Sequence, residues 1–133
     1  MFNEPVYVDT NIIMDFLLER DHAAYLFLDR ALRCEFLIII SDVVLHELTY
    51  QGLELESSNL IQILRAGGKC IILHVSEEDK KEAKAVVAAR KTHYNDALHA
   101  SVACRSGCKA FVTKNLKDFT CFKDLNVKRA DEI

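Results

Sequence analysis

The sequence predicts an α/β domain built on a mostly parallel sheet, and three observations indicate this fold class. Short apolar runs rich in Val, Ile and Phe alternate with longer segments whose apolar residues recur at helical spacing. EFLIIIS, residues 35–41, is almost continuously apolar, as expected for a strand that is buried on both faces of a sheet. Half of the 133 residues are hydrophobic, with only four Gly and one Pro, which fits one domain with a core of its own.

The chain is expected to begin with one strand and two helices. PVYVD, residues 5–9, is a short run of β-forming residues. Residues 11–20 and 23–33 carry apolar residues at helical spacing. Asn11 and Asp21 are the expected N-caps of these two helices, because their short polar side chains can accept hydrogen bonds from free backbone amides.

The middle of the chain, after the strand at 35–41, predicts two helices, a strand and a third helix. Residues 41–52 begin with Ser and end with Gly, so this helix has a signal at each end. Residues 57–68 form a short helix closed by glycines, and CIILHVS, residues 70–76, is the next strand. Residues 76–90 open with Ser-x-x-Asp, a capping-box variant, and gather acids in the first turn, where the helix dipole favours them.

The last third of the chain predicts a helix followed by two strands. YNDALHASVACRSG, residues 94–107, is a helix rich in small residues that ends at Gly107. KAFVT, residues 109–113, reads as a strand, and residues 127–130 as a last edge strand. Sites in parallel α/β sheets gather just beyond the carboxyl ends of the strands, so the polar residues that follow each strand are the functional candidates.

Nothing in the sequence indicates export or membrane insertion. The longest apolar run, residues 36–40, is far shorter than the roughly 20 residues that a membrane-spanning helix needs. The N-terminus, MFNEP, has neither the basic nor the apolar region of a signal peptide. We therefore expect a soluble, cytoplasmic protein that makes no contact with membranes.

The five cysteines argue against a secreted disulfide scaffold, because their number is odd and their spacing follows no framework. Cys104 and Cys108 could form a redox or metal-binding pair. Small thiols that pack a helix against the sheet are the better explanation, since free cysteine behaves as a small hydrophobic residue. The sequence contains no CxxC motif, so it gives no support for a zinc site.

The charges are unevenly distributed along the chain. The net charge of −3 by itself argues against a nucleic-acid-binding protein. Residues 1–89, however, carry 8 Lys and Arg against 15 Asp and Glu, whereas residues 90–133 carry 9 against 5. An acidic first part and a basic last part could meet at one cleft.

Four acidic residues lie where the predicted strands end or where helices begin: Asp9, Glu47, Asp96 and Asp118. Each taken alone is also explained as a helix cap or as a partner of the helix dipole. If they converge, however, two carboxylates about 4 Å apart repel each other by roughly 4 kcal/mol. Such a cluster must take up protons or bind cations, and its all-oxygen ligation suits Mg²⁺ or Mn²⁺, whose usual partners are phosphates.

Four stretches of the sequence resemble the signature stretches of the PIN-domain family, most closely its VapC-type toxins of toxin–antitoxin pairs. They are VDTNIIMDFL, SDVVLHEL, YNDALHASVA and FVTKNLKDF, in this order between Val6 and Phe119, followed by LNVKRADEI. Each stretch is weak by itself, but their order and spacing together are specific. The resemblance implies a three-layer α/β/α sandwich in which residues 1–133 form a single nuclease domain.

The resemblance also implies roles for the residues that match the family pattern. Asp9, Glu47 and Asp96 would be the first three metal ligands. Thr10 and Asn11 would orient Asp9 and bound water through hydrogen bonds.

A last polar group would comprise Thr113, Asn115 and Asp118. Many family members carry an acid two residues after this threonine, and here the residue is Asn115. Either Asp118 supplies the missing charge as the fourth ligand, or Asn115 holds a water.

The activity implied by the resemblance is metal-dependent hydrolysis of RNA phosphodiester bonds, with Mg²⁺ or Mn²⁺ as cofactor. The implied partners are an RNA substrate, a cognate antitoxin protein, and a second copy of the chain that docks on the early helices. Residues 23–33 and 59–64 could provide this dimer surface, or both could be core. A PIN-like module that binds RNA or protein without cutting, and a housekeeping RNA-processing nuclease, remain alternatives.

Two further groups of residues allow either of two interpretations. The basic side chains near the last acidic stretches could contact the RNA backbone or form a solvated surface, and they are Arg90, Lys91, Lys114 and Lys117. His46 and His99 lie next to, or one turn from, proposed ligands. Each could serve in catalysis or metal binding, but a partly buried helical histidine with a local hydrogen bond is the expected reading.

Overall fold

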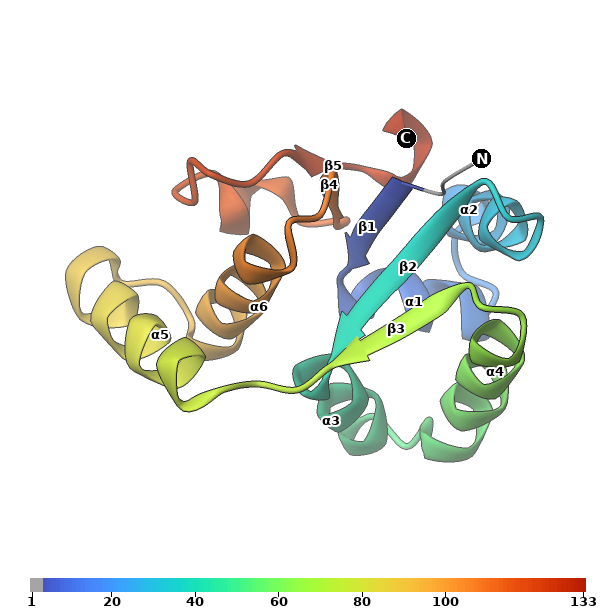
Figure 1. The fold of residues 1–133 in the computed structure, drawn as a ribbon, viewed down its shortest axis with the longest axis horizontal. Helices are drawn as coiled ribbons and strands as arrows, with labels where there is room; N and C mark the ends of the chain where they lie inside the picture. Colours follow the sequence, from blue (N-terminus) through green and yellow to red (C-terminus); the bar gives the residue numbers. More distant parts are fainter. Residues whose placement is uncertain (1–3) are drawn as a thin grey trace.

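The computed structural model describes residues 4–133, which form a five-stranded sheet with helices on both faces (Figure 1). The strands are β1 (Glu4–Val8), β2 (Phe36–Ser41), β3 (Cys70–Leu73), β4 (Ala110–Val112) and β5 (Val127–Lys128). The helices are α1 (Thr10–Leu17), α2 (His22–Leu32), α3 (Asp42–Tyr50), α4 (Glu54–Ala66), α5 (Glu77–Arg90) and α6 (Tyr94–Ser106), with two short 3₁₀ helices, η1 (Leu116–Phe119) and η2 (Ala130–Glu132). The predicted α/β fold class is confirmed.

The strand order is β3-β2-β1-β4-β5, and each pairing in the sheet is parallel. The chain moves outward from β1 to β2 and β3, then crosses back to place β4 and β5 on the other side of β1. The strand order therefore reverses between β1 and β4. In open α/β sheets, the crevice beyond the carboxyl ends of the strands at such a point is the usual place for a binding site.

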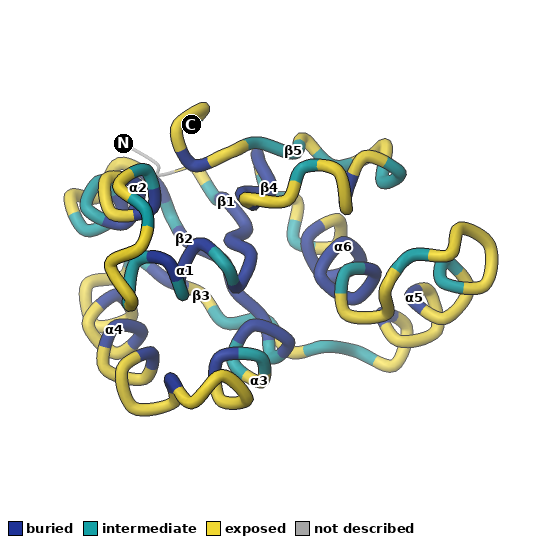
Figure 2. The backbone as a smooth tube through the Cα atoms, turned by 180° about the vertical axis from the view of Figure 1, so that it is seen from behind, coloured by how far each residue is buried: buried dark blue, intermediate teal, exposed yellow. Residues whose placement is uncertain are grey.

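Alternation along the strands divides the core into two layers. Val6 and Val8 of β1 face the layer covered by α1, α2 and α4, whereas Tyr7 faces the layer covered by α6. Both faces of β2 are buried, as its continuous apolar run predicted. Figure 2 shows the buried residues along β1 and within α6, with α5 largely exposed outside α6.

One predicted cap was wrong. The sequence favoured Asn11 as the N-cap of the first helix, but α1 begins at Thr10 and its cap is Asp9. The backbone of Asp9 is extended, with φ −69° and ψ 153°, and its side chain accepts a hydrogen bond from the Thr10 amide. Asp9 is therefore both a helix cap and the first residue beyond the central strand. The caps predicted at Asp21 and Ser41, and the capping box of Ser76 with Asp79, are confirmed.

The strand predicted at 70–76 is shorter than expected. It ends at Leu73, whose register partner Ser41 is the last residue of β2. Beyond this point no neighbouring strand continues, and the backbone amide of Val75 donates to the Asp42 carboxylate instead, at 2.9 Å. The helix predicted at 57–68 also begins earlier, at Glu54.

Candidate metal site

Asp9 lies at the carboxyl end of β1, beside the end of β4, and its carboxylate is buried and fixed on both oxygens. Oδ1 accepts from the Thr10 amide at 2.7 Å, and Oδ2 accepts from the Thr113 hydroxyl at 2.8 Å. Thr10 follows Asp9 directly, whereas Thr113 follows β4, so the contact between Asp9 and Thr113 depends on the pairing of β1 with β4. Two predicted site residues thus hold the first proposed ligand in one orientation.

Glu47 reaches the same place from α3, the helix that follows β2. Its Oε1 accepts from the hydroxyl of Thr10 at 2.5 Å and from His99 Nε2 at 2.7 Å. Its Oε2 accepts from the Asn95 side chain at 3.4 Å. Thr10 therefore connects the two acids: its amide contacts Asp9 and its hydroxyl contacts Glu47.

His99 lies against both acids. It projects from α6 with 1% of its surface exposed, and its Nε2 is 2.7 Å from Glu47 Oε1 and 3.5 Å from Asp9 Oδ1. Asp9, Glu47 and His99 each offer one ligand atom, and these atoms all lie within 4.8 Å of one another. The other histidine that the sequence singled out, His46, is exposed on α3.

A buried hydrogen-bond chain supports His99 from behind. Its Nδ1 lies 2.8 Å from the Tyr7 hydroxyl, which in turn lies 2.7 Å from the Ser41 hydroxyl. Burial raises the pKa of Tyr7 far above its usual value, so the phenol keeps its proton. In a neutral imidazole, Nε2 donates to the Glu47 carboxylate, which can only accept, and Nδ1 accepts from Tyr7.

Sequence reasoning did not single out Tyr7, Ser41 or Asn95 as site residues. Tyr7 is an aromatic residue inside an apolar strand, and Ser41 is fully explained as a helix cap, so neither carried a separate signal. The position of His99, one turn after Asp96, was a signal, but a local hydrogen bond was the preferred interpretation. Its observed partners, Tyr7 and Glu47, are instead 92 and 52 residues away in the chain.

Asp96 and Asp118 are the other two acids of the predicted set, and Asp96 is repelled by the charges of Asp9 and Asp118. Asp96 is half-buried in the first turn of α6, and Asp118 is exposed in η1. Burial raises the pKa of Asp96 to about 6, and the negative charges of Asp9 and Asp118 add to the rise. Asp96 therefore lies close enough to both Asp9 and Asp118 to be repelled by each, although the ligand atoms that converge are those of Asp9, Glu47 and His99.

The two acids that contact His99 respond in opposite ways. Burial raises the pKa of Asp9, despite opposing contributions from His99 and its hydrogen bonds. Burial also opposes ionisation of Glu47, but the hydrogen bond from His99 and, when this imidazole is protonated, its positive charge outweigh burial and lower the pKa of the Glu47 carboxyl. His99 thus offsets the effect of burial on the pKa of Glu47 more fully than it does for Asp9.

Asn11 and Asn115 brace the segment that follows β4. The backbone amide of Asn115 donates to the Thr113 hydroxyl at 3.1 Å, and Asn115 itself is exposed. The sequence predicted that Asn11 orients Asp9, but its Oδ1 accepts from the backbone amide of Lys114 at 3.3 Å. Asn11 therefore ties α1 to the segment that carries Thr113.

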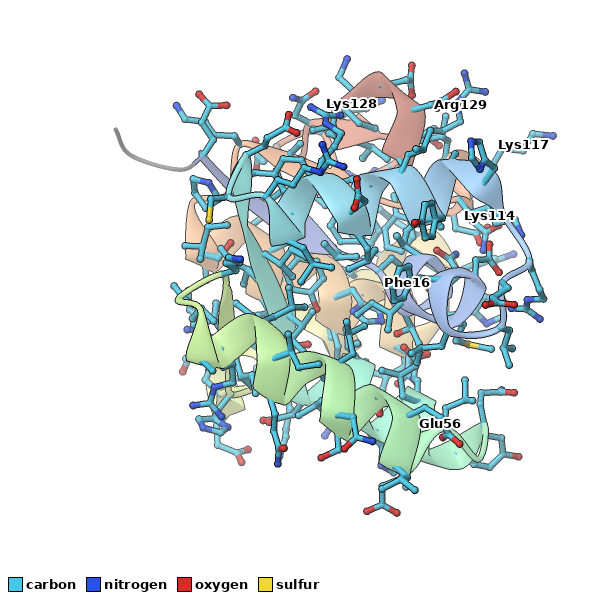
Figure 3. All side chains as sticks on the ribbon, turned by 90° about the vertical axis from the view of Figure 1, so that its right-hand side faces the viewer. Phe16, Glu56, Lys114, Lys117, Lys128 and Arg129 are labelled. Atoms are coloured by element: carbon cyan, nitrogen blue, oxygen red, sulfur yellow. The ribbon has the colours of Figure 1, made fainter. Side chains whose placement is uncertain are left out.

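Lys114, for which the sequence allowed either RNA contact or a solvated surface, forms an ion pair within the protein. Its Nζ lies 2.9 Å from Asp15 Oδ2, and the Asp15 side chain is fully buried. Figure 3 shows Lys114 and Lys117 on the same side of the molecule as Lys128 and Arg129. These four cations come from the basic C-terminal part of the chain, and we call them the basic rim. Arg129 also lies 3.5 Å from Asp131 and from Glu132.

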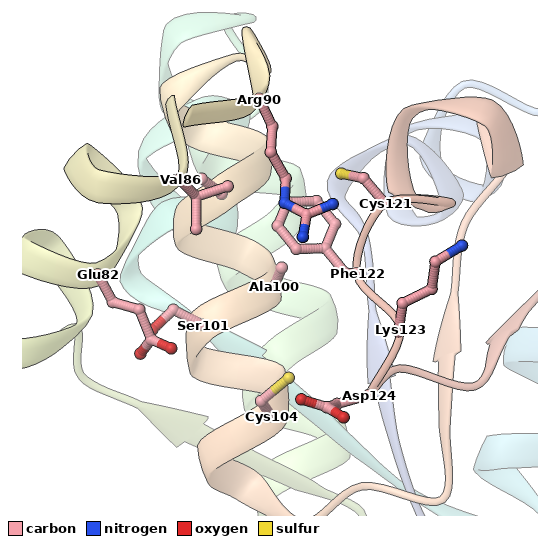
Figure 4. A pocket seen from close by; sticks show the side chains of 11 residues that line it. Glu82, Val86, Arg90, Ala100, Ser101, Cys104, Cys121, Phe122, Lys123 and Asp124 are labelled. Atoms are coloured by element: carbon pink, nitrogen blue, oxygen red, sulfur yellow. The ribbon is translucent and has the colours of Figure 1, made fainter. Parts of the chain in front are cut away.

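The other two predicted cations lie at the end of α5. Arg90 and Lys91 are exposed, and Arg90 lines a cavity of about 230 Å³ between α5, α6 and residues 121–124 (Figure 4). Cys104, Cys121 and Phe122 also line this cavity, whereas the acids of the candidate site lie elsewhere. The cavity is therefore separate from the acidic cluster.

The donor set of the cluster fits a divalent cation. Two carboxylates and one imidazole converge from β1, α3 and α6, and each carboxylate is oriented by hydrogen bonds that leave lone pairs free. Burial, and after it the charge of neighbouring carboxylates, raises the pKa of both Asp9 and Asp96, so their negative charges are costly in the folded protein. A cation held there would relieve this repulsion.

Several solved structures share the fold of this chain. VapBC2 from Rickettsia felis, solved with a DNA fragment from its promoter, superposes with a TM-score of 0.71 at 21% identity, covering 94% of this chain and 98% of that one. VapBC-1 from nontypeable Haemophilus influenzae gives 0.70 at 17% identity, covering 96% and 98%. A toxin–antitoxin complex from Klebsiella pneumoniae gives 0.65 at 19% identity, covering 94% and 97%.

At these identities the likeness lies in the fold. The comparison with curated proteins gave no match. Among residues 4–133, no helix has both the length and the apolar character needed to cross a membrane.

The family model of the PIN domain matches residues 6–124. Because this match spans most of the chain, the protein belongs to the PIN-domain family, as its four signature stretches predicted.

Proposed function

We propose that this protein is a metal-dependent endoribonuclease, and that it acts in the cytoplasm as the toxin of a type II toxin–antitoxin pair. The observation that carries the proposal is the convergence of Asp9 and Glu47 at one edge of the sheet, with Asp96 close enough for the charges of Asp9 and Asp118 to raise its pKa. Membership of the PIN-domain family supports the same activity.

The protein's own residues bind and orient the reacting groups. Asp9, Glu47 and Asp96 would hold Mg²⁺ or Mn²⁺, and Asp118 would add negative charge at the outer edge of the site. Thr10 and Thr113 keep the Asp9 and Glu47 carboxylates in position, so that little reorganisation is needed when the cation binds. A bound divalent ion supplies Lewis-acid stabilisation of the charge that develops on phosphate oxygens during hydrolysis.

The basic rim supports RNA as the substrate. Lys117 and Arg129 are exposed beside the end of β4, where they can contact phosphates on either side of the scissile bond. Arg90 and Lys91 provide further positive charge at the end of α5. We expect single-stranded or looped RNA, because its bases and backbone can enter a cleft that an A-form helix cannot.

The proposed protein partners are an antitoxin and a second copy of the chain. The structural neighbours are chains of toxin–antitoxin complexes, which supports the first proposal. An antitoxin could place a basic side chain among the acids and block the cation. For the dimer, α2 and α4 contribute to the core and yet leave Tyr25, Leu26 and Ile63 exposed, with 53%, 46% and 62% of their surfaces accessible.

Cleavage of an RNA panel tests the activity. Purified protein is incubated with single-stranded and hairpin RNAs in Mg²⁺, in Mn²⁺ or in EDTA. We expect fragments only when a divalent ion is present, and about a hundredfold slower cleavage by Glu47→Gln. Glu56→Gln, a matched change of an exposed acid on α4, should cleave normally. Binding of RNA without cleavage would instead identify a silent PIN-like module.

The toxin assignment needs a separate test in cells. Induced expression should arrest growth, and co-expression of a small protein encoded immediately upstream should relieve the arrest. Unchanged growth, with cleavage confined to a few precursor RNAs, would identify a housekeeping nuclease.

A further inference from the structure

The candidate site contains one donor that the acidic pattern in the sequence did not provide. Magnesium in proteins is held almost entirely by oxygen atoms and keeps several of its waters. An imidazole nitrogen is instead a common ligand of first-row transition ions. His99 places such a nitrogen, Nε2, against both Asp9 and Glu47.

We propose that His99 is a nitrogen ligand of this site, and that the site therefore selects a first-row transition ion such as Mn²⁺ over Mg²⁺. The inference rests on the proposed function only in taking the cluster as a metal site. It concerns which ion binds there and through which atom.

The spacing of the donor atoms supports shared ligation. Two ligand atoms that each lie about 2.1 Å from one ion are about 3.0 to 3.4 Å apart in octahedral or tetrahedral geometry. Nε2 is 2.7 Å from Glu47 Oε1 and 3.5 Å from Asp9 Oδ1, so the observed separations bracket this range. The third pair of donors, from Asp9 and Glu47, lies within 4.8 Å, so the two carboxylates must move closer together to share one cation.

The environment of the other imidazole nitrogen also suits ligation. A histidine that binds a metal through Nε2 must carry its proton on Nδ1 and donate it to a partner. The partner here is the Tyr7 hydroxyl at 2.8 Å, and a hydroxyl can accept as well as donate. Tyr7 can then turn its own proton toward Ser41 at 2.7 Å, so the buried chain accommodates either direction of donation.

The alternative role for His99 is purely positional, as a hydrogen-bond donor that holds Glu47. Substitution by glutamine separates the two roles. The amide of His99→Gln can still donate a hydrogen bond to Glu47, but it does not supply an aromatic nitrogen ligand. His46→Gln is the matched control, because His46 is exposed and adjacent to Glu47 in the chain.

The test adds Mn²⁺ to tag-free protein and records electron paramagnetic resonance spectra of the bound ion. Pulsed spectra should show ¹⁴N modulation from a coordinated imidazole in the native protein and in His46→Gln, but not in His99→Gln. In competition titrations, the excess of Mg²⁺ needed to displace half of the Mn²⁺ should fall about tenfold in His99→Gln. Tyr7→Phe should keep the nitrogen signal but bind Mn²⁺ about tenfold more weakly.

Two results would overturn the inference: bound Mn²⁺ without nitrogen coupling in the native protein, or equal losses of Mn²⁺ and Mg²⁺ affinity in a folded His99→Gln. The native spectrum decides the question even if the variant does not fold. Failure of RNA cleavage with the nitrogen signal intact would contradict the proposed function alone. Cleavage by a protein whose Mn²⁺ shows no nitrogen coupling would contradict this inference alone.

Discussion

Two buried groups of acidic side chains in this protein have opposite electrostatic character. Between α5 and α6, the Asp79 carboxylate accepts hydrogen bonds from the Ser76 backbone amide, the Ser101 hydroxyl and the Arg105 guanidinium, and these outweigh burial and lower its pKa to about 2. At the sheet edge, burial and neighbouring carboxylates raise the pKa of Asp9 and bring that of Asp96 to about 6.

The difference separates a structural cluster from a candidate functional one. The Asp79 carboxylate is matched by donors within the chain, so its negative charge stabilises the folded protein. The acids around Asp9 are oriented by threonines, but among residues 4–133 their ion-pair partner is His99, and no lysine or arginine pairs with them. An arrangement that is unfavourable by itself, and that a bound cation would make favourable, is expected of a metal site rather than of a structural contact.

The largest expected effect is on the rate of RNA cleavage, and it should distinguish Asp9→Asn from the same substitution at Asp79. Asp9→Asn should slow RNA cleavage about a thousandfold, equivalent to about 4 kcal/mol of activation free energy, because it removes a charged ligand and keeps the shape of the side chain. Asp79→Asn should lower stability but leave cleavage per folded molecule unchanged. Rates are measured with Mn²⁺ on an RNA that the native protein cuts, and normal cleavage by Asp9→Asn would contradict its assignment as a ligand.

Cation binding should stabilise the protein through one cluster only. With free Mn²⁺ at about a hundred times its dissociation constant, the free energy of unfolding should rise by about 2.7 kcal/mol. Asp9→Asn should lose this gain, whereas a variant of the Asp79 cluster should keep it. Urea unfolding with and without EDTA measures the difference, and a gain that persists in Asp9→Asn would place the cation elsewhere.

Removal of the cation that matches Asp79 should destabilise the fold. Arg105→Met leaves the buried carboxylate without its guanidinium, and we expect a loss of about 2 kcal/mol. The loss is smaller than for a fully buried pair, because 44% of the Arg105 side chain is exposed and water can replace part of the interaction. Arg33→Met, which breaks the exposed pair with Asp29, should cost less than about 1 kcal/mol in the same urea titration.

The smallest effect is a difference in pH dependence. The pKa of Asp96 is raised from about 3.9 in the unfolded chain to about 6, so the folded protein binds this proton more tightly. The contribution of Asp96 to the free energy of unfolding is therefore greatest below about pH 4, and it is lost as the pH rises through 6. The Asp79 contribution has the opposite sign, since it is present above about pH 4 and is lost as the pH falls toward 2.

Asp96→Asn should consequently melt about 3 °C higher than the native protein at pH 7.5 in EDTA, and the gap should narrow toward pH 5. Asp131→Asn, a change of an exposed acid in η2, should show no such trend. A gap of equal size at both pH values would exclude ionisation of Asp96 as its cause.

Local signals in the sequence were enough to predict most of the fold. The apolar run of β2, the Ser41 cap and the capping box at Ser76 depend on neighbours a few residues away, so the sequence displays them directly. The early end of β3 occurs where a distant group decides the outcome. β3 stops where β2 ends, and the Val75 amide is taken by Asp42, 33 residues earlier in the chain.

The candidate site divides in the same way. The sequence by itself determined that acids follow the strands, because side chains at the carboxyl ends of parallel strands share one edge of the sheet. Only the tertiary structure decided that the third ligand atom beside Asp9 and Glu47 comes from His99 rather than from another predicted acid. That choice depends on how α6 packs over Tyr7, and on which face of β1 Tyr7 occupies, and these are contacts between segments that no local pattern records.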